Sequence, residues 1–318
     1  MNLLKLLFSV SYKNVLFSKR GFHQKNSFVV NHLENVGRSF LNGYHKSLDK
    51  CSVADVKAFV NTVEDKYRGF TSEGASMGLT IKDFLSFNSY KRIRLYLEEQ
   101  ADEIYINHVG IGWAFSRLPV SIESQILKFD DLLRWLIIDG YGFHQAYFKT
   151  HQYVYDMAPP TELKNPFAKK VFYQGIGRAL WFVESTDILR IYNRVQKFPE
   201  KYHADLWAGI GLAAGYAGGC NADEYKQLRY FSEGFYEHLY QGVCFGVSAR
   251  VKGKNIIEGT ILAALILCNQ TPEELYEISE VSRKSIDKHI SSEEKYAQWK
   301  EKIRLTLSKS YKYEELNQ

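Results

Sequence analysis

The sequence predicts an all-α fold with little or no β-sheet, and three observations support this prediction. Helix-start signals recur along the chain, and the apolar residues between them follow a helical period. Alternating strand patterns are almost absent, apart from residues 27–30. With 318 residues, 45% of them hydrophobic, the chain can bury a large core in one or two domains. We expect nine to twelve helices.

The N-terminus is basic and amphipathic. Five of the 41 Lys and Arg residues lie in residues 1–33, which contain no acid, and the other 36 equal the 36 Asp and Glu. The body is therefore neutral, whereas a nucleic-acid-binding body would be expected to carry a basic surplus. We expect no nucleic-acid partner.

Residues 1–30 are predicted to form an amphipathic basic helix or arm, although their composition is also typical of a transit peptide. The arm would dock on the body through Leu3, Leu4, Leu7 and Phe8, or touch a membrane surface through residues 1–20. No window approaches the roughly 20 apolar residues of a spanning helix. The four cysteines lack metal or redox spacing, which indicates free thiols in a cytoplasmic protein.

Helix starts are marked by capping-box spacing, in which an N-cap side chain precedes an acid by three residues. Residues 221–224 and 271–274 fit this pattern, the second with proline at the first helical position. Weaker signals of the same type begin at Ser52, Thr80 and Ser185.

Gly-x-Gly recurs at 110–112, 140–142, 175–177 and 209–211, at intervals of roughly 30–35 residues. A dinucleotide phosphate loop needs a preceding strand and a complete GxGxxG, and none of these sites has either. Small residues on one helical stripe let another backbone approach closely. We therefore interpret these glycines as close helix crossings and not as phosphate cradles.

The glycine motifs belong to a loose internal repeat. Residues 109–115 align with 174–180, and residues 67–77 align with 202–212. A weaker match to the same repeat begins at residue 241. The repeat predicts packed helical pairs that each use glycine at a crossing.

The tail is predicted as charged helices that pack on the core. Between residues 291 and 311, apolar side chains recur at helical spacing at Tyr296, Trp299, Ile303 and Leu307. The chain therefore divides into the N-terminal arm, a glycine-rich all-α core over 31–270, and C-terminal charged helices over 271–318.

Several motifs together resemble a bacterial family of uncharacterised function, often labelled enediyne biosynthesis proteins because its members occur in polyketide gene clusters. They cover roughly residues 20–250: RGF (20–22), LENVGRSFLNGY (33–44), EGASM (73–77), HVGIGWAFSRL (108–118), LLRWLIIDGYGFHQAYF (132–148), QGIGRALWFV (174–183) and DLWAGIGLAAGYAGG (205–219). The resemblance implies a bacterial cytoplasmic protein linked to natural-product assembly. It implies no particular reaction, and it supplies no catalytic residues.

Three polar residues within the apolar, glycine-rich segments are candidate catalytic residues. Glu73 precedes a run of small residues, where burial would raise the pKa of a carboxyl group and suit it to acid–base chemistry. His108 and His144 each lie two residues from a Gly-x-Gly. The alternative roles are structural: an ion pair of Glu73 with Arg178, and satisfied core histidines.

Substrate-binding candidates lie in the same motifs. Arg178, between glycine and apolar residues, is the best candidate for holding an anion, unless it forms a salt bridge with Asp139 or Asp205. Both aspartates lie near glycine crossings, where they could also act as helix N-caps. The candidates for the aromatic wall of a cavity are Trp113, Trp181 and Trp207.

Metal-dependent classes lack their motifs. Asp130 and Asp131 resemble the start of an isoprenoid-synthase motif, but Arg134 stands where magnesium binding needs an acid. Glu200 and His203 form one ExxH, and a di-iron bundle needs two. We predict no metal site and assign no cofactor.

Two functions fit these features. In the first, an enzyme or accessory protein binds or processes a hydrophobic polyene or polyketide-like molecule in a helix-lined aromatic pocket. Glu73 and His144 would move protons, and Arg178 would hold negative charge. In the second, a non-catalytic scaffold binds a biosynthetic enzyme. An enzyme should gather Glu73, His108, His144 and Arg178 around one pocket, whereas a scaffold should disperse them in separate salt bridges and expose an apolar patch.

Overall fold

The computed structural model describes residues 3–315, and within these residues it contains helices and no strand, which confirms the all-α prediction. The α-helices are α1 Leu3–Phe8, α2 Phe17–Arg20, α3 Ser27–Leu48, α4 Val53–Asn61, α5 Asp65–Leu85, α6 Lys91–Glu99, α7 Ile104–Phe115, α8 Ile122–Ile126, α9 Arg134–Phe148, α10 Pro166–Val183, α11 Ile188–Val195, α12 His203–Ala217, α13 Ala222–Phe231, α14 Tyr236–Lys252, α15 Glu258–Cys268, α16 Pro272–Lys284 and α17 Ser292–Glu315. Short 3₁₀ or π turns cover Tyr12–Val15, Ala101–Glu103, His151–Tyr155 and Glu200–Tyr202.

These seventeen helices exceed the expected nine to twelve. The difference arises because several helices are too short to show a period, such as α8 with five residues and α11 with eight. A hydrophobic period of 3.6 residues needs two or three turns before it stands out.

Side-chain caps mark some of the helix starts, whereas the N-cap residues of α5, α7, α9 and α12 form no such hydrogen bond. Capping boxes form at Ser52, Asn221 and Thr271, as their spacing predicts. The start expected at Thr80 is wrong, because Thr80 lies inside α5 and its hydroxyl donates to the carbonyl of Ser76 one turn earlier. The strand-like residues 27–30 are the first turn of α3.

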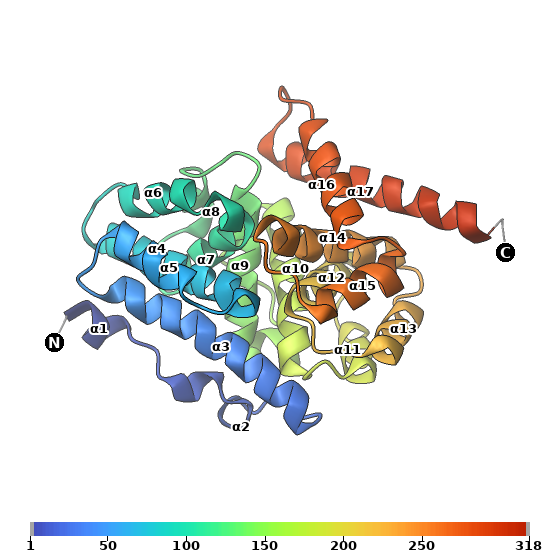
Figure 1. Ribbon diagram of the computed structural model, residues 1–318, viewed down its shortest axis with the longest axis horizontal. Helices are drawn as coiled ribbons and strands as arrows, with labels where there is room; N and C mark the ends of the chain where they lie inside the picture. The colour runs from blue at the N-terminus through green and yellow to red at the C-terminus, as the bar shows by residue number, and fades with distance from the viewer. Residues whose placement is uncertain (1–2, 316–318) are drawn as a thin grey trace.

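Seven long helices form the centre of the molecule, and each packs on the next in chain order: α3, α5, α7, α9, α10, α12 and α14. We call these the inner helices. The shorter helices α4, α6, α8, α11 and α13 connect them at the periphery (Figure 1). One inner helix with its connecting segment spans roughly 30–35 residues, which accounts for the glycine interval.

Glycines occupy the crossings between successive inner helices, often in reciprocal pairs. A methyl group on Gly140 of α9 would lie 2.1 Å from the carbonyl oxygen of Val109 in α7, and one on Gly112 of α7 would lie 2.0 Å from that of Ile137 in α9. The same reciprocity joins α9 to α10 and α10 to α12. Only a residue without Cβ lets two backbones approach this closely, so the glycines are helix crossings, as predicted.

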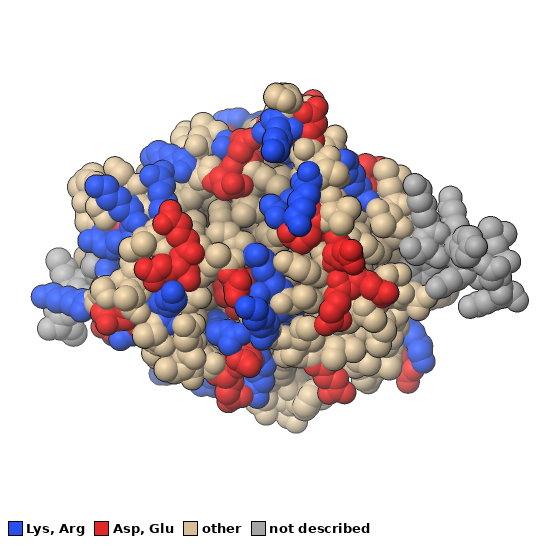
Figure 2. Space-filling view, turned by 45° about the horizontal axis from the view of Figure 1, so that its top comes forward, with Lys and Arg blue, Asp and Glu red and all other residues tan. Residues whose placement is uncertain are grey.

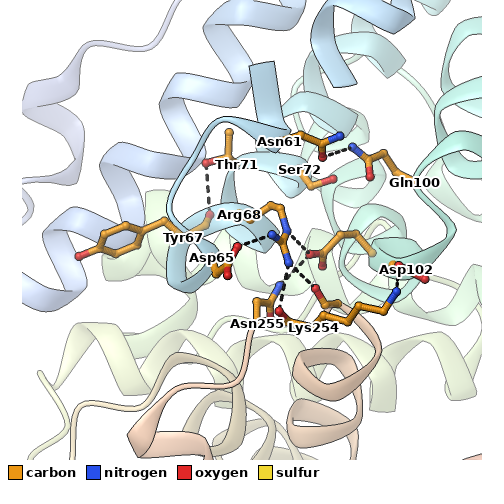
Figure 3. Close-up of polar contacts among 12 residues, drawn as sticks. Asn61, Asp65, Tyr67, Arg68, Thr71, Ser72, Gln100, Asp102, Lys254 and Asn255 are labelled. Carbon is orange, nitrogen blue, oxygen red and sulfur yellow. Dashed lines mark hydrogen bonds and ion pairs between the residues drawn. The ribbon is translucent and has the colours of Figure 1, made fainter. Parts of the chain in front are cut away.

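The series closes on itself through polar contacts. His32 of α3 lies 2.7 Å from the carbonyl oxygen of Ala217 at the end of α12. Arg68 of α5 donates to the carbonyl of Gly253 after α14 at 2.7 Å, and Arg250 of α14 donates to that of Lys66 at 2.9 Å. Figure 3 shows Arg68 at the centre of this junction. The inner helices therefore surround a common interior.

The two ends of the chain pack on opposite sides of the molecule (Figure 1). Phe8 and Phe17 dock on the body, but Leu7 is 64% exposed, so the docking expected of Leu7 is wrong. The side chains of Leu3 and Leu4 lie outside the described residues. Tyr296, Trp299, Ile303 and Leu307 of α17 are buried, which confirms the predicted face.

The surface carries charges of both signs. Figure 2 shows Lys and Arg intermingled with Asp and Glu over one face. None of the helices in residues 3–315 is long and apolar enough to cross a membrane.

Replacing a crossing glycine tests the packing. We expect Gly140→Ala to lower the free energy of unfolding by about 3 kcal/mol, because the new methyl group overlaps the Val109 carbonyl. Helix propensity alone predicts the opposite sign, a gain of about 1 kcal/mol. Urea unfolding measures the difference.

The control is Gly234→Ala, where no atom lies within 4 Å and φ is +83°. It should cost only the left-handed strain, about 1 kcal/mol. A Gly140→Ala protein as stable as the wild type would contradict the crossing.

Candidate ligand cavity

A largely apolar cavity, which we call the inner chamber, lies between the inner helices. Including its opening, it contains about 610 Å³ of space. Its walls come from α3, α5, α7, α9, α10 and α12, and Val15 of the N-terminal arm contributes from outside the series. The lining residues are Val15, Val36, Gly37, Phe40, Leu41, Phe70, Glu73, Trp113, Phe143, Tyr147, Phe148, Arg178, Phe182, Leu212, Ala213, Tyr216 and Ala217.

Glu73 is the one carboxylic acid among these lining residues. It is buried in the middle of α5, beside small residues that bring α3 and α7 close: Gly74 abuts Phe40, and Gly110 abuts Glu73 itself. Its Oε1 atom has no hydrogen-bond partner. Burial raises the pKa of Glu73 to about 8, although the positive charge of Arg178 acts in the opposite direction. At neutral pH Glu73 is therefore mostly the neutral acid.

Two further polar atoms of the lining have no partner. They are the indole nitrogen Nε1 of Trp113 and the hydroxyl of Tyr216, and both are buried. An unpaired buried donor or acceptor costs about 1–3 kcal/mol. The Trp113 side chain lies within hydrogen-bonding reach of Glu73, whereas the Tyr216 hydroxyl lies beside Gly69 and Glu103. Glu73 and Trp113 are therefore the polar groups that this apolar space offers to a bound oxygen atom.

Arg178 lines the same chamber but already has a partner. Its guanidinium forms an ion pair with Asp139 of the neighbouring helix α9 and lies 5.0 Å from the ring centre of Phe143. Both members of the pair are buried. Asp139 lies inside α9, so the N-cap interpretation of Asp139 is wrong, because the helix continues on both sides of it. The salt bridge considered from the sequence is present.

The pair belongs to a buried polar network that reaches the C-terminal helix. Gln174 donates to Asp139 Oδ2 at 2.8 Å and accepts from Lys300 Nζ of α17 at 3.0 Å. Lys300 also lies 3.8 Å from Asp205. Burial raises the pKa of Asp205 and lowers that of Lys300, so it disfavours the charged form of each.

Asp205 does not act as an N-cap either, because it lies in the first turn of α12 and Tyr202 occupies the cap position. Its carboxylate instead anchors α17 to the core through Lys300.

His144 lies in an adjoining space, which we call the outer chamber. It contains about 640 Å³ including its opening, and its lining comprises Ser9, Val10, Asn14, Phe40, Leu41, Met77, Trp113, Arg117, His144 and Phe148. Four of these residues also line the inner chamber, so the two spaces share a wall. Burial lowers the pKa of His144 to about 3, with smaller contributions from Arg117, Lys149 and Arg20. Its Nδ1 atom has no partner.

The other sequence-derived candidates lie elsewhere. His108 lines neither chamber, and its Nδ1 contacts the carbonyl of Ile104 at 2.8 Å. Trp181 donates to the carbonyl of Gly218, and Trp207 is buried outside both linings. The structure therefore brings together Glu73, Arg178 and Trp113, places His144 next to them, and leaves His108, Asp205, Trp181 and Trp207 apart.

Three relevant residues were missed in the sequence. Tyr216 lies in the small-residue run 205–219, where a single large polar side chain is the signal that could have identified it. Arg117 lies within the motif HVGIGWAFSRL (108–118) and is half-buried at the outer chamber. Lys300 carried no such signal, because its burial depends on where α17 docks.

In the described part of the chain, no group of three or more His, Cys, Asp or Glu side chains is arranged to hold a metal ion. The polar side chains that line the chambers can form hydrogen bonds and exchange protons with a ligand. The fold and cavity thus define an all-α protein whose helices surround a largely apolar internal cavity.

The sequence matches the model of one known family over residues 1–307, and the chain belongs to that family, described as "Protein of unknown function (DUF1702)". The match confirms the expected membership of a family of unknown function and extends it beyond residues 20–250. No curated protein and no solved structure matches the chain.

The raised pKa of Glu73 predicts a pH-dependent stability. Between the ordinary carboxyl pKa of 4.5 and the folded value of about 8, the folded state binds more protons than the unfolded state. Stability therefore falls as pH rises through this window, by at most about 1.4 kcal/mol per pH unit. We expect the unfolding free energy of Glu73→Gln to fall less than that of the wild type between about pH 5 and about pH 8.

The comparison uses chemical denaturation of both proteins, with Glu64→Gln as control because the Glu64 side chain is 70% exposed. Glu103 also titrates in this window, since burial raises its pKa to about 7, but it is present in every variant. Parallel pH profiles for the wild type and Glu73→Gln would contradict the assignment.

Breaking the Arg178–Asp139 pair should be costly. Asp139→Asn leaves a buried guanidinium without its counter-ion, and we expect a loss of about 3–5 kcal/mol. Asp223→Asn breaks the exposed pair with Lys226 and should cost less than about 1 kcal/mol. Thermal and urea unfolding of the two variants compare them, and equal losses would refute the buried network.

Proposed function

We propose that this protein binds and processes a hydrophobic polyene or polyketide-like molecule in the inner chamber, with Glu73 as a general acid. The resemblance to enediyne biosynthesis proteins supports the ligand class, because a polyene chain made by polyketide assembly is long, apolar and sparsely oxygenated. The chamber supports it independently, because aromatic and aliphatic side chains form nearly all of its lining. The proposal places the protein in a bacterial cytoplasm.

The observation that carries the proposal is the unpartnered Oε1 of Glu73, which lines an apolar chamber together with the Trp113 indole. A purely structural carboxyl group at this depth would be expected to have a hydrogen-bond partner. A carbonyl or hydroxyl oxygen of a ligand would accept from protonated Glu73 and from the Trp113 indole.

The same geometry supports proton transfer. Glu73 holds a proton at neutral pH because burial raises its pKa. When that proton moves from the carboxyl group to a ligand oxygen, Glu73 becomes a carboxylate. The positive charge of Arg178 lowers the energy of this carboxylate, and Asp139 holds Arg178 in position. Glu73 is therefore the acid, and Arg178 stabilises its conjugate base.

The N-terminal arm suggests how an apolar ligand arrives. Leu6 and Leu7 of α1 are 61% and 64% exposed, close in sequence to Ser9 and Val10 of the outer chamber. We extend the proposal to peripheral contact of residues 1–20 with a membrane surface, from which the ligand enters.

Native mass spectrometry of protein purified from its own host tests the proposal. We expect the wild type to release a small apolar molecule on mild denaturation. Ala213→Phe fills the inner chamber and should prevent retention. Glu73→Gln should retain the molecule unconverted or bind it on the order of 10-fold more weakly, since one hydrogen bond to the ligand changes. The matched control is Glu64→Gln, at the exposed start of the same helix.

An empty wild-type protein that instead retains a protein partner would overturn the proposal. Such a result would favour the scaffold alternative, in which the chambers are structural and a biosynthetic enzyme is the partner.

A further inference from the structure

We propose that the outer chamber binds the carboxylate head group of the ligand, with Arg117 as its principal partner, while the apolar chain occupies the inner chamber. The inference rests on the proposed function and adds the ligand class, a long-chain apolar carboxylic acid.

The two chambers are suited to the two ends of such a molecule. They share Phe40, Leu41, Trp113 and Phe148, so the two spaces adjoin, and a ligand that reaches from one into the other would lie along these aromatic and aliphatic side chains. The inner chamber is almost wholly apolar. The outer chamber adds hydroxyl, amide, imidazole and guanidinium groups at its far side.

Arg117 is a half-buried cation without a counter-ion. It follows the end of α7, and its Nη1 donates to the carbonyl of Phe8 at 2.9 Å and to the hydroxyl of Tyr44 at 2.8 Å. Across residues 3–315, no Asp or Glu forms an ion pair with it. These two neutral acceptors fix the guanidinium plane and leave its other N–H groups for a ligand. A guanidinium fork matches the two oxygens of a carboxylate.

His144 supplies a second contact to the same chamber. Its Nδ1 is buried without a partner, and its ring lies edge-on to Trp113 with the ring centres 5.4 Å apart. Burial and the nearby cations keep this imidazole neutral near pH 7. With its proton on Nδ1, His144 can donate to a carboxylate oxygen without adding charge.

The surrounding charges favour an anion. Arg20, Arg117 and Lys149 all act on His144 as positive charges. The acids that contact the N-terminal arm already have partners: Glu34 accepts from the Phe17 amide and pairs with Arg38, and Asp49 pairs with Lys5. The outer-chamber lining therefore contains the cation Arg117 and no acid, so a ligand would have to supply the balancing negative charge. A monoanionic carboxylate supplies that charge.

The test compares a polyene fatty acid with its own methyl ester. Parinaric acid fluoresces when its conjugated chain enters an apolar site, so both compounds can be titrated into the purified full-length protein. We expect the wild type to bind the acid on the order of 10-fold more tightly than the ester, because only the acid forms a charge-assisted hydrogen bond. Arg117→Met should abolish this preference and leave ester binding within about 2-fold.

Arg94→Met is the matched control, because Arg94 is an exposed arginine that lines neither chamber, and it should keep the wild-type preference. Arg117→Lys keeps the charge and should retain part of the preference, which covers the case in which Arg117→Met fails to fold.

Equal binding of acid and ester by the wild type would overturn the head-group site and leave the apolar chamber intact. Equal weakening of both ligands in Arg117→Met would also overturn it, since Arg117 would then only hold the arm. If neither compound binds to the wild type, this inference and the proposed function both fail.

Discussion

Direct contact between helix backbones is the constraint on which the rest of the structure depends. At each crossing of the inner helices a glycine faces a carbonyl oxygen of its neighbour, at a distance that no Cβ allows. Close crossings determine the relative orientation of the helix axes. This orientation in turn determines which side chains between the crossings point into the interior. Glu73 points into the interior because Gly74 and Gly110, on either side of it in space, hold α5 against α3 and α7. The positions of the glycines therefore determine where the chamber forms. Large aromatic side chains line the space that remains between the crossing helices.

Such an interior carries more charge than an apolar core normally holds. Arg178, Asp139 and Lys300 are all buried, and each is satisfied by partners on a different helix. This arrangement ties α17, which is distant in sequence, to the centre of the molecule. Glu73 differs from these three groups, since its Oε1 atom has no protein partner, a property that it shares with Oε2 of the buried Glu103. The contrast separates a structural network, complete in itself, from a group that a ligand would complete.

The fold was largely predictable from the sequence and the site only in part. Capping boxes at Ser52, Asn221 and Thr271 are local signals, and the glycine spacing is a periodic one. Both can therefore be recognised in the sequence without knowledge of the tertiary structure. Glu73 and Arg178 were identifiable because burying a charged side chain among small residues is costly unless it has a partner or a functional role. His108 carried the same signal as His144, yet only the rotation of α7 against α9 places one at a chamber and the other in the core. Tyr216 and Lys300 depend on contacts between segments far apart in the chain, which no local pattern records.

One joint in the ring of inner helices differs in kind from the others. Six crossings rest on packed backbone, whereas the contact between α5 and the end of α14 rests on Arg68, Arg250 and Glu103 with the residues around Gly253. Figure 3 shows Arg68 within this contact. When two helices with packed backbones separate, they lose all of their contacts together. Hydrogen bonds to a turn can instead be replaced by hydrogen bonds to water one at a time. Local opening of the native state therefore begins at this seam, and amide hydrogens next to it exchange with solvent before those of the glycine crossings.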